Sequence, residues 1–426
     1  MKARNVLITA MVILMLLPGV LFAQAAAEET DSNTMRLAWW GNPTRDERTY
    51  KAVEMFEAEN PGVTIETETT GWSGYWDKMN TQAAAGSLPD LMQHDYAYML
   101  QWVERNQLAD LTPYVDKGII DLSKINDSFL TGGMVDGKLY GISLGTNAVC
   151  LTYDPAVLKK AGISQINSAT WTWADFERIA LQVYQKTGVQ TIPFFTTDPK
   201  VGFDNMIRQT GASTYGETGL GFTDPAALRE FYAIQLRLLD AGALIKPETA
   251  FVTVSPEEGA IAKGETWVEF IWSNQFVSTQ AAAQRPLEIA LLPNLKNAKA
   301  KGTFLKPSMF FSIPASAENP ELAAKFLNYF VNDIKVNDML MGERGVPIPD
   351  DVREHMSTMV DPINKQIFDY ISLASKNAGP IDAPDPAGSG EFLKMVRDVT
   401  QEILMKRVSL DEGVAKIMSR GNEILK

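Results

Sequence analysis

The chain of 426 residues carries 52 acidic and 39 basic side chains, and its formal net charge is −13. An acidic protein without a cluster of Lys or Arg repels nucleic acid and anionic membrane surfaces, so these partners are excluded. Its length exceeds what one compact core usually holds, so two domains are expected, and the single cysteine, Cys150, cannot form an internal disulfide.

The first 25 residues have the pattern of a secretory signal peptide. Lys2 and Arg4 precede an apolar run at 6–17, and small residues follow at 23–25. The run is shorter than a membrane span requires, although a retained anchor is the alternative interpretation. No cysteine stands at the exit for lipid attachment. We therefore expect a periplasmic protein that is released by a cleavable signal peptide and is not a lipoprotein.

The N-terminal part of the mature chain alternates predicted strands and helices. MRLAWW at 35–40 is typical of a strand, Thr44 can cap the helix that follows, and VTIETE at 63–68 alternates like a second strand. A second helix at 75–85 leads to a short strand at 90–93. This alternation predicts an α/β lobe with a parallel sheet.

Three extended segments predict crossings between two lobes. They lie at 137–154, at 289–293 and in GERGVPIP at 342–349. Between the first two crossings, TWADFE predicts a helix that Thr172 caps. We expect the first lobe to comprise residues 34–145 and 294–344, and the second lobe residues 146–293 and 345–426.

Motifs of metal-dependent or covalent catalysis are absent from the sequence. The chain has only two histidines, His94 and His355, and it contains no HExxH, paired CxxC, Gly-x-Ser-x-Gly or phosphate-binding glycine loop. We therefore expect no catalytic residue, no metal and no cofactor. A carboxylate pair of the glycosidase type stays open, because any two of the 52 acids could be nominated.

Aromatic and polar residues gather where the predicted strands end. In open α/β sheets ligands bind at the carboxyl ends of strands, where flat aromatic faces suit pyranose rings and polar side chains suit sugar hydroxyls. Strand alternation turns one of two neighbouring tryptophans inward, so which of the first pair faces a ligand stays open. The acid after the third strand also has the alternative role of a helix cap. The candidates are Trp39, Trp40, Trp72, Tyr96 and Trp272 among the aromatic residues, and Asn42, Asp95, Asn147, Ser273 and Asn274 among the polar ones.

The chain contains, in this order, the blocks KAVEMFEAENPGVTIETE, AAAGSLPDLMQHD, GKLYGISLGTNAVCLTYDPAVLKKAGI with TWTWADF, and PASAENPELAAKFLNYFVND. Together they resemble the extracellular solute-binding proteins of family 1, the maltose-binding-protein-like receptors of ABC importers. The resemblance covers essentially the whole mature chain. It implies two lobes joined by a multi-strand hinge, a sugar chain bound in the cleft, and docking of the closed form onto a membrane permease.

Other blocks are WWGNPTRDERT, GWSGYWDKM, WSNQF, LKPSMFFSIP, GERGVPI and APDPAGSGE. They are similar to a branch of this family associated with pectin, specifically with rhamnogalacturonan-type oligosaccharides. Position by position, the resemblance implies that Trp40, Asp95 and Trp272 belong to the site. A pectic ligand carries uronic carboxylates, which a guanidinium holds through two hydrogen bonds, so Arg45 and Arg344 are further candidates. The alternatives are a solvated helix-end charge for Arg45 and a structural hinge contact for Arg344.

We predict a two-lobed α/β protein in which each lobe has a mostly parallel sheet flanked by helices and a multi-strand hinge joins the lobes. We expect a monomer that captures an oligosaccharide, pectic or rhamnogalacturonan-derived, by aromatic stacking and hydrogen bonds and delivers it to an ABC permease. One alternative is a secreted polysaccharide-degrading enzyme. The other is a receptor of the same fold for another solute, such as a polyamine or glycerol phosphate.

Overall fold

The structure is a computed structural model that describes residues 33–194, 202–251 and 258–426. The predicted signal peptide at 1–25 lies outside these residues. Among the described helices, none combines the length and the apolar character that a bilayer crossing requires.

The sheet of the first lobe consists of β1 (Thr34–Trp40), β2 (Thr64–Thr70), β3 (Leu91–His94), β6 (Ile142–Asn147) and β10 (Lys306–Ser312). Their spatial order is β2-β1-β3-β10-β6. β1 is parallel to β2 and β3, whereas β10 is antiparallel to β3 and β6. The predicted α/β character of this lobe is therefore confirmed, and its parallel part consists of the first three strands.

The first helix, α1 (Pro43–Glu59), begins two residues earlier than the sequence predicts. The cap is Asn42, whose side chain accepts a hydrogen bond from the Arg45 backbone N–H. Pro43 at the first helical position has no N–H to satisfy, which favours this start. The prediction that Thr44 caps the helix is therefore wrong.

Further elements surround this sheet. They are α2 (Trp72–Ala85), α3 (Tyr96–Glu104), α4 (Thr112–Asp116), η2 (Asp127–Phe129), η3 (Thr131–Gly133), β4 (Met134–Val135), β5 (Lys138–Leu139), α11 (Pro320–Asn332) and α12 (Ile334–Leu340).

The sheet of the second lobe consists of β7 (Val149–Tyr153), β8 (Val268–Trp272) and β9 (Glu288–Ala290). β7 lies in the centre and is antiparallel to both neighbours, so the prediction of a mostly parallel sheet is wrong for these strands. β7 leads away from the crossing that follows Asn147, whereas β8 ends beside that crossing with Trp272 opposite Val149. The two strands must therefore run in opposite directions. Parallel pairing occurs here in isolated bridges such as Gln190 with Thr266.

The helix α6 (Trp173–Thr187) begins where the sequence predicts it. Thr172 and Asp175 form a reciprocal capping box, and Phe176 and Val183 are buried on one helical face. The other helices after β7 are α5 (Pro155–Lys160), α7 (Phe203–Gln209), α8 (Ala226–Asp240), α9 (Pro247–Ala250), η5 (Ser273–Gln275), α10 (Phe276–Ala283), α13 (Asp350–Ser357), α14 (Pro362–Asn377), α15 (Ser389–Leu404) and α16 (Leu410–Ile424).

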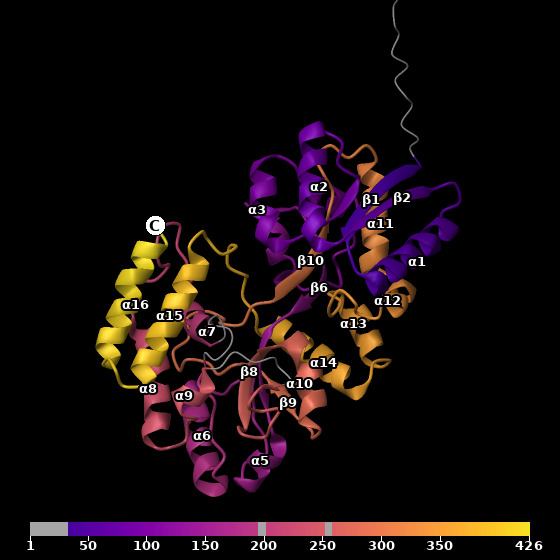
Figure 1. Cartoon of the computed structure of the whole chain (residues 1–426). Coiled ribbons are helices and arrows are strands. Elements are labelled where there is room, and N and C mark those ends of the chain that lie inside the picture. The colour runs from indigo at the N-terminus through magenta and orange to yellow at the C-terminus, as the bar shows by residue number, and fades with distance from the viewer. Residues whose placement is uncertain (1–32, 195–201, 252–257) are drawn as a thin grey trace, which may run out of the picture.

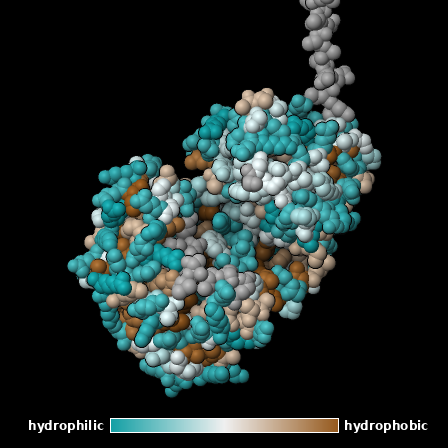
Figure 2. Space-filling model, in the orientation of Figure 1, coloured by the Kyte–Doolittle hydropathy of each residue, from teal (hydrophilic) through white to brown (hydrophobic). Residues whose placement is uncertain are grey.

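Figure 1 shows one body around β1, β2 and α1 and another around α5, α6 and α16, with β6 and β10 passing between them. The helices α13 and α14 lie where the two bodies meet. The surface is hollowed between the bodies, as Figure 2 shows. The lobe boundaries given above stay a prediction.

Candidate functional site

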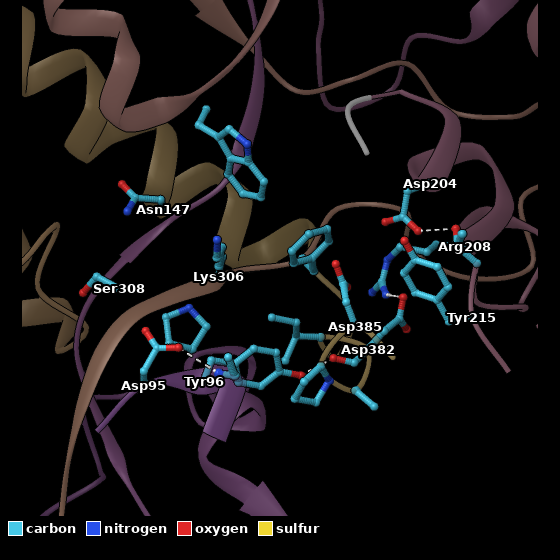
Figure 3. Close-up of a pocket in the computed structure, with 18 of the residues that line it drawn as sticks. Asp95, Tyr96, Asn147, Asp204, Arg208, Tyr215, Lys306, Ser308, Asp382 and Asp385 are labelled. Atoms are coloured by element: carbon cyan, nitrogen blue, oxygen red, sulfur yellow. Dashed lines mark hydrogen bonds and ion pairs between the residues drawn. The ribbon is translucent and has the colours of Figure 1, made fainter. Parts of the chain in front are cut away.

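A cleft of about 660 Å³ lies between the lobes and is lined by residues of both. The lining comes from the turn between β3 and α3, the ends of β6 and β8, the start of β10, α7, and the segment 381–385. Figure 3 shows these side chains directed into a common space. Segments that are far apart in the sequence therefore meet at one site.

The strands that cross between the lobes form the floor of the cleft. Lys306 at the start of β10 pairs in register with Asn147 at the end of β6. Trp272 ends β8 beside this crossing, where the Ser273 N–H donates to the Ala148 carbonyl over 2.9 Å and the Ala148 N–H donates to Ser273 Oγ over 3.2 Å. The side chains of Asn147, Lys306 and Trp272 thus stand on backbone that is fixed by hydrogen bonds.

Two aromatic rings and two cations are arranged along this floor. The indole of Trp272 is half-buried, and its centre lies 6.1 Å from that of Phe304 at 74°, an edge-to-face contact. Lys306 Nζ lies over the indole, 5.2 Å from its centre, and the Arg208 guanidinium lies over Phe304 at 4.9 Å. Cations within this range are attracted to aromatic faces.

The facing wall belongs to the start of α3. Asp95 caps this helix through Oδ1, which accepts from the Ala97 N–H over 2.9 Å. The Tyr96 hydroxyl donates to the Asp382 carbonyl. Burial raises the pKa of Tyr96, and the nearby carboxylates of Asp382 and Asp385 raise it further, so the hydroxyl stays protonated and remains a donor.

Arg208 on α7 holds the segment around Asp382 in place. Its side chain is 5% exposed and forms a 2.5 Å ion pair with Asp382. It also donates to the Gly302 carbonyl over 3.1 Å and to the Pro380 carbonyl. The positive charge of Arg208 is therefore already matched by a carboxylate of the protein.

The structure brings together a subset of the residues that the sequence nominates. The cleft is lined by Asp95, Tyr96, Asn147, Trp272 and Asn274. The other seven nominated residues lie outside this lining; they are Trp39, Trp40, Asn42, Arg45, Trp72, Ser273 and Arg344.

The tryptophans of the first lobe pack against each other at the end of β1. Trp39 is fully buried, and its Nε1–H donates to Asp46 Oδ1 over 2.7 Å, so it packs in the core and lies outside the cleft lining. Trp40 is 7% exposed, because the rings of Trp72 and Tyr75 cover it edge-on at 5.0 and 5.1 Å. Trp72 is 47% exposed but lies outside the cleft lining.

Neither nominated arginine reaches the cleft. Arg45 forms a 3.0 Å ion pair with Glu343, which corresponds to a structural role. Arg344 is buried and donates to Gln93 Oε1 over 3.1 Å and to Thr49 Oγ1 over 2.8 Å. Burial lowers the pKa of Arg344 to about 9, with a further contribution from the charge of Arg45. The position of Arg344 thus agrees with the alternative interpretation, in which this arginine makes a structural contact and does not bind the ligand.

Two polar candidates also have structural roles. Asn42 caps α1, and its side chain accepts from the Arg45 N–H over 3.0 Å. Ser273 is fully buried and holds Ala148 at the strand crossing. Both side chains are occupied by backbone contacts, so their nomination as ligand contacts is not supported by their positions.

Reasoning from the sequence missed Lys306, Arg208 and the segment 381–385. Lys306 and Ser308 occupy alternate positions of a strand, and both line the cleft, so the polar alternation in LKPSMFFSIP was a usable signal. Arg208 lies on a short helix whose side chains are buried, and no local pattern marks it. The segment 381–385 reads only as a Pro/Gly-rich loop.

The site offers groups for binding. Among the residues that the structure describes, no three or more His, Cys, Asp and Glu side chains are placed to hold a metal ion. His94 is fully buried next to Asp95, and burial lowers its pKa to about 3, so the imidazole is neutral at physiological pH. The lining thus combines aromatic faces with amides, carboxylates and an ammonium, which suits a polar ligand that has flat apolar patches.

Two relatives share sequence with parts of the chain. A putative binding protein of Brucella abortus (strain 2308) is 30% identical over 108 residues, which are 25% of this chain and 26% of that protein, so the chain spans about a quarter of that relative's length. The lactose-binding protein of Rhizobium radiobacter is 25% identical over 311 residues, which are 69% of this chain and 70% of that protein.

Solved structures resemble nearly the whole chain. An extracellular solute-binding protein of family 1 from Alicyclobacillus acidocaldarius subsp. acidocaldarius DSM 446 has a TM-score of 0.85 and 28% identity, covering 92% of this chain and 98% of that chain. A periplasmic oligogalacturonide-binding protein from Yersinia enterocolitica has a TM-score of 0.76 and 23% identity with the same coverage, which shows a shared fold. The family described as bacterial extracellular solute-binding protein matches residues 51–366. This chain therefore belongs to the bacterial extracellular solute-binding protein family.

Proposed function

We propose that this protein captures an oligosaccharide in the cleft between its lobes and delivers it to the membrane permease of an ABC importer. The observation that carries the proposal is the half-buried indole of Trp272 on the floor of a cleft with walls from both lobes. A pyranose ring presents C–H patches that stack on such a face. The surrounding amides of Asn147 and Asn274 and the carboxylate of Asp95 suit its hydroxyls.

Closure of the lobes follows from contacts with both walls. A sugar that touches Asp95 and Tyr96 on one side and Trp272 and Asn274 on the other gains all of these contacts only when the lobes approach each other. Ligand therefore shifts the population towards a closed state. That closed state is what the permease is proposed to recognise.

For the substrate we favour a pectic, rhamnogalacturonan-derived oligosaccharide. The lactose-binding relative and the oligogalacturonide-binding neighbour support a saccharide ligand. The blocks WSNQF and LKPSMFFSIP, which carry Trp272 and Lys306, support the pectic branch. A uronic carboxylate would have to meet Lys306, because Arg45 and Arg344 are engaged elsewhere.

The proposal includes a monomeric mature protein in the periplasm, released after removal of residues 1–25. The pattern of a charged start, an apolar run and small residues supports export. Membership of an extracellular family agrees with that compartment.

Calorimetric titration of the mature protein with a panel of neutral and uronic oligosaccharides tests the proposal. We expect heat that saturates at one sugar chain per protein, with the sugar recovered unchanged by chromatography. Shortened or unsaturated products would instead identify a polysaccharide-degrading enzyme. If a polyamine or glycerol phosphate raised the melting temperature and no saccharide did, the protein would be a receptor for that solute and not for an oligosaccharide.

A further inference from the structure

Gln275 lines the cleft shortly after Trp272, and the protein already uses one half of its amide. The side chain is half-buried, and its Oε1 accepts a hydrogen bond from the Trp272 backbone N–H over 2.9 Å. A backbone N–H can only donate, so the amide atom that faces it must be the oxygen. The amide nitrogen therefore occupies the other end, and its N–H groups are the part of this side chain that remains for a ligand.

Gln275 differs in this respect from the other glutamines that receive a backbone N–H. Within the described part of the chain these are Gln209, Gln235 and Gln280, whose Oε1 atoms accept from the backbone N–H groups of Leu295, Phe194 and Leu287. Each of the three also donates through Nε2 to an oxygen of the protein. For Nε2 of Gln275 the described residues provide no acceptor, although it borders the cleft.

This donor is held in position before any ligand arrives. The hydrogen bond to the Trp272 N–H restricts the side chain, and the hydroxyls of Ser278 and Thr279 in α10 donate to the Gln275 carbonyl over 3.1 and 3.0 Å. A side chain that is already restricted loses less conformational freedom when it binds. Because Gln275 holds the backbone of Trp272, the donor and the indole keep a fixed relation to each other.

A second amide near the indole is turned the same way. Ser273 Oγ accepts from the Ala148 N–H over 3.2 Å and donates to Asn147 Oδ1 over 3.4 Å. The nitrogen of Asn147 is therefore also the end that is left for the cleft. The amides of Asn147 and Gln275 thus both present donors to a molecule that stacks on Trp272.

We infer that Gln275 binds the saccharide directly, with Nε2 donating to an acceptor oxygen of the sugar that stacks on Trp272, while Oε1 holds the Trp272 backbone in place. This inference rests on the proposed function, which requires only that a saccharide binds. It goes further by assigning a specificity-determining donor to the site. A site with such a donor discriminates against a ligand that leaves it unpaired.

The test is calorimetry on the mature protein with lactose, digalacturonic acid and a rhamnogalacturonan tetrasaccharide as probes. Gln275→Glu keeps an oxygen for the Trp272 N–H and replaces the donating nitrogen by a second oxygen. Gln275→Met removes the donor without adding a charge. Gln280→Glu is the matched control, because Gln280 accepts the Leu287 N–H in the same way but donates to the Arg285 carbonyl and lies outside the cleft lining.

At about pH 7 we expect both Gln275 variants to weaken each probe that binds the wild type by about tenfold or more, because a hydrogen bond to the sugar is lost. The melting temperature of Gln275→Glu should stay within about 2 °C of the wild type, since the bond to Trp272 is kept. Gln280→Glu should do the reverse. It should leave the affinity within about twofold and lower the melting temperature further, because its new oxygen faces the Arg285 carbonyl.

Lowering the pH to about 4 protonates the carboxyl of Gln275→Glu, whose ordinary pKa is about 4.3, and restores a donor at the position of Nε2. The ratio of its Kd to that of the wild type at the same pH should therefore fall about threefold or more, whereas the ratio for Gln275→Met should not change.

Wild-type affinity in Gln275→Met would overturn the inference while leaving a saccharide receptor, because a loss confined to Gln275→Glu would then be an effect of the added charge. A Kd ratio of Gln275→Glu that stays constant between about pH 7 and about pH 4 would overturn it as well. If none of the three probes binds the wild type, the proposed function itself fails, and the inference fails with it.

Discussion

The ends of β1 and β8 both carry indoles followed by small polar residues, yet their surroundings differ. At the end of β1, Trp39 is fully buried and Trp40 is 7% exposed, because α2 lays Trp72 over it. At the end of β8, Trp272 stays half-buried, since the chain turns away into Ser273–Gln275 and the opposite surface belongs to the other lobe. An aromatic residue at a strand end is thus open to ligand only where no helix of its own lobe covers that end.

The largest expected effect is at the buried end. Trp39→Ala should lower the free energy of unfolding by about 3–5 kcal/mol, because truncating a fully buried indole leaves a cavity. The change also removes the donor to Asp46 Oδ1. Urea unfolding measures the loss, and the sugar affinity of the folded fraction should not change. Weaker sugar binding at unchanged stability would show instead that Trp39 contacts the ligand and that the end of β1 is open.

Buried ionisable groups extend the comparison between the lobes. Burial lowers the pKa of His94 in the first lobe from 6.5 to about 3, so the unfolded state binds a proton that the folded state does not. The free energy of unfolding therefore falls as the pH drops from about 6.5 towards about 3, by up to about 1.4 kcal/mol per pH unit.

Burial raises the pKa of Glu269 in the second lobe from 4.5 to about 7. Between about pH 4.5 and about 7 the Glu269 carboxyl is therefore ionised in the unfolded state but still protonated in the folded state. The free energy of unfolding consequently falls as the pH rises through this range.

Two variants separate these opposite slopes. His94→Phe should reduce the loss of stability below about pH 6.5, and Glu269→Gln should reduce the loss between about pH 4.5 and 7. Urea unfolding of each variant from about pH 4 to about pH 8 measures how the free energy of unfolding changes with pH. A Glu269→Gln profile parallel to that of the wild type would mean that Glu269 is ionised in the folded protein.

The open strand end should respond in affinity and not in stability. Trp272→Ala is expected to weaken an oligosaccharide about tenfold or more, because the stacking face at the centre of the site is lost. The free energy of unfolding should fall by less than about 1.5 kcal/mol, since the indole is only half-buried. Calorimetry and urea unfolding of the same sample give both numbers, and unaltered affinity would remove Trp272 from the site.

The smallest effect is expected for Trp72→Ala. This indole is 47% exposed and lies outside the cleft lining, so the sugar affinity should stay within about twofold of the wild type. It is the control for Trp272→Ala because both variants remove an accessible tryptophan, Trp72 at the start of α2 and Trp272 at the end of β8. An equal loss of affinity in the two variants would show that the ligand reaches across the ends of β1 and β2.

Local patterns predicted much of the fold. The helix that starts at Thr172 could be placed because its capping box and apolar spacing involve neighbouring residues. The strands of the first lobe could be placed for the same reason. The antiparallel direction of β7 could not, because it depends on where β8 and β9 end relative to the crossing after Asn147.

The same distinction applies to the site. Asp95 and Trp272 were found because each directly follows or ends a strand. Arg45 and Arg344 were assigned to the ligand, but their partners, Glu343 for one and Gln93 with Thr49 for the other, are mostly distant in sequence. Nothing near either arginine in the chain marks it as engaged.

By itself the sequence determined the alternation of strands and helices, the export pattern and the presence of aromatic and polar residues at strand ends, because these depend on local spacing and side-chain chemistry. Only the tertiary structure decided which of those ends stays open, that Lys306 and not an arginine presents its charge to the cleft, and that Arg208 is matched by Asp382. The reason is that exposure and charge compensation are set by whichever distant segment packs against a residue, and local spacing does not encode that packing.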